Sequence, residues 1–261
     1  MNPLTFPVWL AGTVYLFFSR NAKPYRALGW AFVVVFAIFL VSHGKDYYTS
    51  PAYPIALAAG AVALESVTRS RRGIWVRAIF VALLLAATAA ILPLNLPLLS
   101  PERLVRYVEK FPLKTQASEK AHARVALPHY FAWQFGWPEM VQAVAHAYHS
   151  LPPEEQRETA IIGNNFAESG AIDLLGPKYG LPKSIGVHQS YWLWGPRNYR
   201  GETMIVLGDR PESLKQWCKN VDVIAELNDP YGAVFERHPV LLCRGMRQNL
   251  QQVWPQLKDW D

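Results

Sequence analysis

Four stretches without formal charge fill most of the first hundred residues, and they limit how this chain can fold more than any other feature. They are Met1–Ser19, Ala27–Gly44, Tyr47–Leu64 and Ala78–Ser100. A helix rises about 1.5 Å per residue, so about 18–20 apolar residues cross a hydrocarbon core of about 30 Å. Pro51 and Pro54 delay the helix start in the third stretch and shorten it. We therefore predict a multi-pass α-helical membrane region of about four spans over residues 1–100.

Basic residues concentrate in two of the three loops between these stretches. The first loop holds Arg20, Lys23 and Arg26, and the last holds Arg69, Arg71, Arg72 and Arg77. The middle loop holds only Lys45, beside Asp46. Because loops rich in Lys and Arg stay in the cytoplasm, we expect the middle loop and everything after Ser100 to be extracytoplasmic. The net charge of +6 follows from these membrane-flanking loops and predicts no nucleic-acid partner.

The polar half begins with a short amphipathic segment, Pro101–Phe111, which has Leu104, Val108 and Phe111 on one helical face. This pattern is typical of a helix on the membrane surface, and equally of a linker helix packed on a soluble domain. We assign residues 101–121 to this interfacial helix or linker.

Residues 122–261 have the pattern of a soluble α/β domain. Apolar runs bounded by turn residues predict strands at Thr159–Gly163, Lys183–Val187, Thr203–Leu207, Val221–Leu227 and Pro239–Cys243. Helical patterns lie between and after them, at Pro138–Ser150, Glu168–Leu175, Pro211–Lys219 and Arg247–Leu257. Strands that alternate with helices favour a small, mostly parallel sheet.

Few residues of this domain indicate chemistry. Gly163-Asn164-Asn165 could be a ligand-binding turn at the end of a strand or a strand-to-helix turn with Asn capping. Cys218 and Cys243 could form a disulfide in an oxidising compartment or remain buried free thiols. The seven histidines show no paired metal-ligand motif, and no nucleotide fingerprint is present. We predict no catalytic residue, no metal site and no cofactor in this chain.

An aromatic cluster follows the second predicted strand. It comprises Tyr191, Trp192 and Trp194, preceded by His188. Such rings stack on sugars or lie at a bilayer interface, so these four residues are predicted glycan or membrane-interface contacts. Alternatively, they fill the seam between the soluble domain and the membrane.

Two segments resemble a known family. The run Gly44-Lys45-Asp46-Tyr47-Tyr48, followed by Pro51, Tyr53-Pro54 and a small-residue helix ending in Glu65, is similar to the late membrane segment of glycosyltransferase family 39. These are the protein-mannosyltransferase-like and aminoarabinose-transferase-like membrane enzymes. The stretches Gly180–Pro196, Asp229-Pro230-Tyr231-Gly232 and Glu236-Arg237-His238-Pro239 are similar to the extracytoplasmic tail of bacterial members.

The resemblance implies a bacterial inner-membrane enzyme that transfers a sugar from a polyprenyl-phosphate carrier to an extracytoplasmic acceptor. The family's acidic residue in its first extracytoplasmic loop has no counterpart here, so the chain corresponds to the last four of about a dozen spans. We therefore expect a C-terminal portion that is incomplete for catalysis alone and that needs an N-terminal half. A divalent cation would belong to the complete enzyme.

The same resemblance gives the middle loop a role. Lys45 would hold the donor phosphate as a compact positive charge, while Tyr47 and Tyr48 supply hydroxyls or a stacking face. Alternatively, Lys45 snorkels at a membrane end and the tyrosines form an interfacial belt. At the level of the whole chain, the alternative function is a membrane-anchored module that binds a glycan or a partner without catalysis. A small transport subunit is least favoured, because the charges lie in loops rather than inside the spans.

Overall fold

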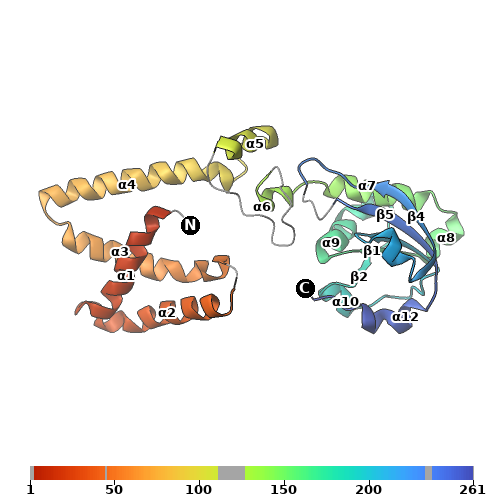
Figure 1. Cartoon of the computed structure of the whole chain (residues 1–261), viewed down its shortest axis with the longest axis horizontal. Coiled ribbons are helices and arrows are strands. Elements are labelled where there is room, and N and C mark those ends of the chain that lie inside the picture. Colours follow the sequence, from red (N-terminus) through yellow and green to blue (C-terminus); the bar gives the residue numbers. More distant parts are fainter. Residues whose placement is uncertain (1–2, 45, 111–126, 233–236, 261) are drawn as a thin grey trace. The chain divides into compact units, whose positions relative to one another are not determined.

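The computed structural model describes residues 3–44, 46–110, 127–232 and 237–260, so Lys45 and most of the linker lie outside the described residues. The chain divides into two compact units, Met1–Leu98 and Leu99–Asp261. Figure 1 shows the first unit as helices in red to yellow and the second as a sheet with helices around it.

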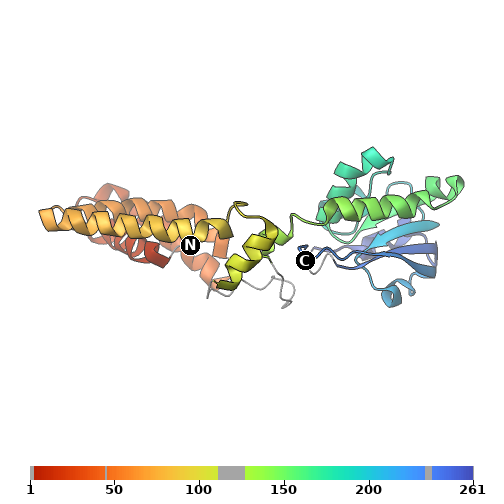
Figure 2. The same cartoon turned by 90° about the horizontal axis from the view of Figure 1, so that it is seen from above.

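The described part of the first unit is helical throughout (Figures 1 and 2). Its helices are α1 (Phe6–Phe18), α2 (Arg26–Val41), α3 (Tyr53–Val67) and α4 (Arg71–Ile91). Shorter 3-10 turns occupy Pro3–Thr5, Lys23–Tyr25, Asp46–Ala52 and Leu92–Leu94.

Two stretches of this unit, Lys23–Val41 and Arg71–Leu94, are long and apolar enough to cross a membrane by length and composition. Only 11% and 0% of their most apolar windows are buried, so their side chains face outward. Helices α1 and α3 have 13 and 15 residues, which is shorter than a bilayer-crossing helix. The predicted region of about four spans thus contains two helices of sufficient length and two shorter ones.

Small residues allow α1 and α3 to cross closely. Ala56 is fully buried, and a Cβ added to Gly12 would overlap its carbonyl oxygen. A Cβ added to Gly60 would overlap the carbonyl oxygen of Val8 in the same way. Close backbone contact through small residues spaced four apart is typical of helix pairs packed in a membrane, where apolar side chains alone provide no driving force for association.

The second unit contains a five-stranded sheet in the order β2-β1-β3-β5-β4. The strands are β1 (Thr159–Gly163), β2 (Ile185–Gly186), β3 (Thr203–Leu207), β4 (Cys218–Glu226) and β5 (Pro239–Met246). Strand β1 runs parallel to β2 and β3, whereas β5 is antiparallel to both β3 and β4. The sheet is mixed, which corrects the prediction of a mostly parallel one. The reason is that β5 lies between β3 and β4 and runs antiparallel to both.

Helices and apolar turns cover both faces of this sheet. The helices of the unit are α5 (Pro101–Lys110), α6 (His129–Ala132), α7 (Trp137–His149), α8 (Pro153–Glu158), α9 (Phe166–Leu175), α10 (Ser190–Trp194), α11 (Pro211–Leu214) and α12 (Leu250–Val253). Within the described residues of the unit, 3-10 turns also occur at Gly176–Tyr179 and Trp254–Leu257. In Figure 1, α7 and α12 lie on opposite sides of the strands.

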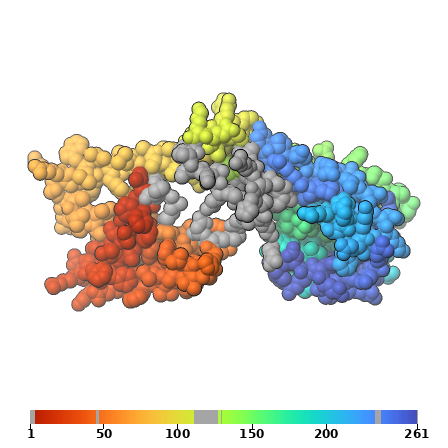
Figure 3. Space-filling model, viewed as in Figure 1, coloured from red at the N-terminus to blue at the C-terminus, as the bar shows by residue number. Residues whose placement is uncertain are grey.

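Each face of the sheet has its own core, because successive side chains of a strand point to opposite faces. Ile161 and Ile205 pack with α7 and α9 on one face. Ala160 and Met204 pack with α12 and the last turn on the other. The C-terminal segment that holds α12 and the last turn, in dark blue, forms the lower surface of the unit in Figure 3.

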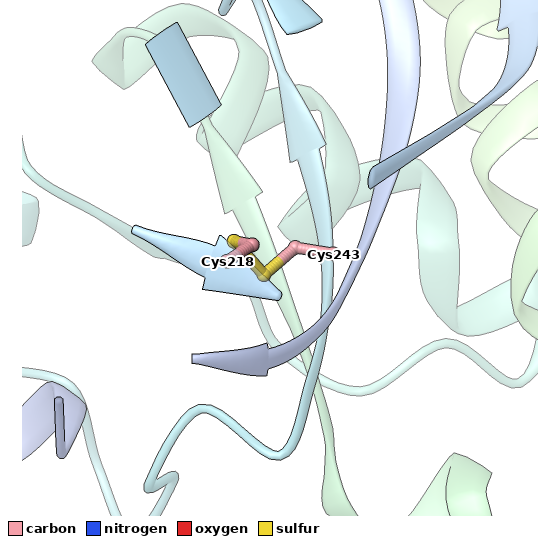
Figure 4. Close-up of a disulfide and its surroundings, with 2 residues drawn as sticks. All are labelled: Cys218 and Cys243. Atoms are coloured by element: carbon pink, nitrogen blue, oxygen red, sulfur yellow. A yellow bond between two sulfur atoms is a disulfide. The ribbon is translucent and has the colours of Figure 1, made fainter. Parts of the chain in front are cut away.

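A disulfide joins Cys218 of β4 to Cys243 of β5, with the two Cα atoms 5.7 Å apart (Figure 4). Both residues are fully buried. This finding decides between the two states that the sequence left open. Disulfides persist in oxidising compartments. Together with the two apolar helices, the bond is consistent with a membrane protein that has an extracytoplasmic domain.

Reduction of this disulfide should weaken the second unit. The bond closes a loop with a sequence separation of 25 residues. Loop-entropy arguments give such a cross-link about 3 kcal/mol of stabilisation. We expect the full chain in detergent to expose thiols only after reduction, and its C-terminal fragment to become susceptible to pulse proteolysis at lower urea. Two reactive thiols in the unreduced chain would contradict the bond.

Candidate functional site

The order of the strands creates a crevice between β1 and β3. These neighbouring strands are parallel, with Thr159 paired to Thr203. The chain leaves β1 through α9 toward β2 on one side of the sheet, and it leaves β3 through α11 toward β4 on the other. Ligands of open α/β sheets bind where two such connections diverge from the carboxyl ends of adjacent strands.

A cavity of about 300 Å³ lies at this point. Asn164 follows β1 and Asp209 follows β3, and both line it. Trp217 adds an indole ring and directly precedes the disulfide residue Cys218. The remaining walls are largely apolar and include Val187, Leu214, Met246, Leu250 and Leu257. The cavity thus combines one aromatic ring, two polar side chains and an apolar wall.

The two loops touch beside the cavity. Gly208 adopts a φ of +76°, a left-handed conformation that glycine tolerates without strain. A Cβ added to Gly208 would overlap the Cβ atom of Asn164. A side chain at this position would therefore push the β1 and β3 loops apart.

A buried Glu–His pair ties the same two loops together. Glu168 is fully buried, and its Oε1 lies 2.8 Å from Nε2 of His238. The backbone N–H of Asn164 donates to Glu168 Oε2 at 2.7 Å, and that of Gly208 donates to His238 Nδ1 at 3.0 Å. A continuous chain of hydrogen bonds therefore runs from the β1 loop, through two side chains, to the β3 loop.

Helix capping places the glutamate. Asn165 is the N-cap of α9, and its Oδ1 accepts hydrogen bonds from the N–H groups of Ala167 and Glu168. Glu168 occupies the third helical position and reaches back to the backbone before the cap, as in a capping box. The capping interpretation of Gly163-Asn164-Asn165 is confirmed for Asn165, while Asn164 lines the cavity.

Two titratable side chains near the crevice, His238 and Asp209, have raised pKa values for different reasons. Burial lowers the pKa of His238, but the hydrogen bond and negative charge of Glu168 outweigh it and hold the pKa above its ordinary value of 6.5. When protonated, Nδ1 of His238 can donate to the Pro239 carbonyl, 3.2 Å away, and then no longer accepts the Gly208 N–H. Burial also raises the pKa of Asp209, although the Arg210 N–H bonded to its carboxylate opposes this. Asp209 is therefore a poorly solvated carboxylate that faces the cavity.

The residues predicted for the middle loop lie in the first unit, away from this crevice in sequence. Tyr47 and Tyr48 belong to the turn Asp46–Ala52, are 53% and 47% exposed, and have ring centroids 4.7 Å apart. Tyr48 also packs on Phe39. Lys45, which precedes the two tyrosines in the sequence, lies outside the described residues. The structure thus brings the two tyrosines together on the surface of the helical unit.

The predicted aromatic contacts lie beyond the end of β2, and most of them are engaged inside the domain. His188 is 5% exposed, stacks on Phe166 and accepts a hydrogen bond from its N–H through Nδ1. Trp192 exchanges indole-to-carbonyl hydrogen bonds with Trp254 at 3.0 Å each. Tyr191 is 8% exposed. Only Trp194 among the four is largely exposed, at 62%.

Sequence reasoning missed the residues that build the crevice. Glu168 and His238 are 70 positions apart, and neither lies in a motif that indicates the other. The one local signal was the Asn-x-x-Glu spacing of Asn165 and Glu168, which is typical of a capped helix start. Among the described residues, no group of three or more His, Cys, Asp or Glu could hold a metal ion.

Comparison with known proteins identifies no relative of this chain: no protein-family model, curated protein or solved structure matches it. The crevice between β1 and β3 is therefore the feature of the described residues that bears most directly on function.

Breaking the buried pair should destabilise the second unit strongly. In Glu168→Gln, one amide oxygen would replace two carboxylate oxygens, so the amide NH₂ would oppose either the Nε2–H of His238 or the N–H of Asn164 and leave buried donors without an acceptor. We expect the free energy of unfolding to fall by about 3 kcal/mol, measured by pulse proteolysis of the C-terminal fragment in urea.

The matched control is Glu155→Gln, which breaks the pair with Arg244 whose side chains are 21% and 40% exposed. It should cost at most about 1 kcal/mol, because water screens and partly replaces such a pair. Equal losses in the two variants would contradict the role assigned to Glu168.

The raised pKa of His238 predicts a pH-dependent stability. The contribution of the charged pair is fully present below the unfolded-state pKa of about 6.5 and is lost as pH rises through the higher folded-state pKa. We expect the stability difference between wild type and His238→Gln to shrink as pH rises above about 6.5. The measurement is pulse proteolysis across this pH range, and a difference that grows with pH would contradict the sign.

Proposed function

We propose that the second unit is a glycan-binding domain carried by a membrane-attached chain. The observation that supports this is the composition of the crevice between β1 and β3. The indole of Trp217 offers a face on which a sugar ring stacks, while Asn164 and Asp209 offer acceptors and a donor for its hydroxyls. A largely apolar cavity with a few convergent polar groups is the usual form of a small-molecule site.

Membrane attachment rests on the first unit. Two helices are long and apolar enough to cross a bilayer, and the disulfide suits a domain outside the cytoplasm. The full proposal is a four-span arrangement in a bacterial inner membrane, with the Arg-rich loops inside and the α/β domain outside. In it the shorter α1 packs against α3 through their small residues.

Binding should depend on the crevice side chains. We expect Trp217→Ala and Asp209→Asn each to weaken binding about ten-fold or more, because each loses a stacking or charge-assisted contact. The probe is an array of bacterial oligosaccharides containing hexoses and amino sugars, offered to the full chain in detergent. Trp260→Ala is the matched control, since this half-exposed ring lies outside the cavity. Absence of binding to any oligosaccharide would overturn the proposal.

A second candidate function is that of a glycosyltransferase portion. The resemblance of Gly44–Glu65 to family 39 favours it, and the exposed pair Tyr47 and Tyr48 offers hydroxyls where a lipid-linked donor would present its phosphate. Lys45 would stabilise the leaving phosphate electrostatically. On this proposal the chain transfers a sugar from a polyprenyl-phosphate carrier only together with an N-terminal half.

Reconstitution separates the two candidates. We expect membranes that contain this chain and an N-terminal half with an acidic first loop to transfer label from a radiolabelled polyprenyl-phosphate sugar. Lys45→Ala should abolish transfer, because the phosphate loses its counter-charge, whereas Lys23→Ala in an Arg-rich loop should not. If both halves together give no transfer while glycan binding persists, the chain is a binding module and not a transferase portion.

A further inference from the structure

Six exposed apolar and basic side chains come from α9, α10 and the residues that follow each of them, elements that contact one another, and none of the six lines the crevice. The apolar members are Leu174, Leu193 and Trp194, which are 79%, 63% and 62% exposed. The basic members, Lys178, Lys183 and Arg197, are exposed as well. We call these six residues the α9–α10 patch.

The carboxylate of Asp173 holds the patch together from beneath. Its Oδ1 accepts hydrogen bonds from the N–H of Ser184 at 2.7 Å and from the hydroxyl of Ser184 at 3.0 Å. Its Oδ2 accepts one from the hydroxyl of Tyr191 at 3.2 Å, whose ring lies 4.7 Å from that of Trp194. Arg197 donates to the Ser184 carbonyl at 3.4 Å. Asp173, which precedes Leu174, thus bonds both to Ser184, which follows Lys183, and to Tyr191, which contacts Trp194.

The charged members of the patch are all basic. Between Phe166 and Arg197 the sequence contains only two carboxylates, Glu168 and Asp173. Glu168 is fully buried in its pair with His238, and Asp173 is bonded inward to Ser184 and Tyr191. The patch therefore carries three cations and no outward-facing acidic residue from segment 166–197. One exposed carboxylate from elsewhere in the chain, Asp259, lies nearby, because its backbone pairs with His188.

We propose that the α9–α10 patch docks the domain on the anionic headgroup layer of a membrane. Exposed Trp and Leu side chains insert at the boundary between headgroups and acyl chains, and Lys and Arg pair with lipid phosphates around them. The positive charge of the patch is complementary to that layer. The hydrogen bonds of Asp173 to Ser184 and Tyr191 fix the segments that carry the patch before it meets a membrane. The inference is independent of the ligand in the crevice.

The test places an environment-sensitive fluorophore on the patch. Both native cysteines are bonded to each other, so Leu193→Cys supplies the single reactive thiol of the full chain. The labelled protein is reconstituted in vesicles of phosphatidylcholine, with or without phosphatidylglycerol, that contain spin-labelled lipid as a quencher. Val223→Cys, at a 51% exposed position of β4, is the matched control.

We expect lipid quenching at position 193 to be several-fold stronger with phosphatidylglycerol than without it, and quenching at position 223 to be weak in both. Adding Lys183→Glu and Arg197→Glu to Leu193→Cys should remove the difference. Equal quenching at the two positions overturns the proposal, as does quenching that ignores lipid charge. Shielding of position 193 in native membranes but not in vesicles would instead indicate a protein partner and would also overturn it.

Discussion

The hydrogen-bonded pair of Glu168 and His238 is the interaction on which the rest of the second unit depends. Glu168 belongs to α9, which follows the parallel strand β1, and His238 directly precedes the antiparallel strand β5, so the pair joins these two parts of the unit. Through the N–H groups of Asn164 and Gly208 it also fixes both loops that border the crevice. A buried carboxylate is costly unless all its partners are present, so this pair favours one arrangement of these loops over the alternatives.

Strand β5 is restrained at two points. His238 anchors its start through Glu168, and the disulfide from Cys243 to Cys218 fixes it to β4 further along. This matters because β5 is the last strand of the sheet to be made and must insert between β3 and β4. Two restraints of different chemistry therefore secure the strand that lies between β3 and β4. The disulfide also lies next to the candidate ligand site, because Trp217 directly precedes Cys218.

Local patterns in the sequence were enough to find most elements of the fold. The strands Thr159–Gly163 and Thr203–Leu207 have the predicted bounds, because each is a short apolar run between turn residues. The helix predicted over Pro211–Lys219 is wrong beyond Leu214, since Cys218 already begins β4. Strand direction was not accessible, because side-chain alternation reports which face is buried and says nothing of which strand lies alongside. Partners 70 residues apart, such as Glu168 and His238, leave no local trace.

The close contact of Gly208 with Asn164 bears on how the crevice could change during evolution. A larger residue at position 208 would separate the two loops and disturb the Gly208 N–H that bonds to His238. That position is therefore closed to variation, whereas Asn164, Asp209 and Trp217 can each be exchanged without touching the Glu168–His238 pair. Ligand preference could then diverge through these three side chains while the frame beneath them stays constant.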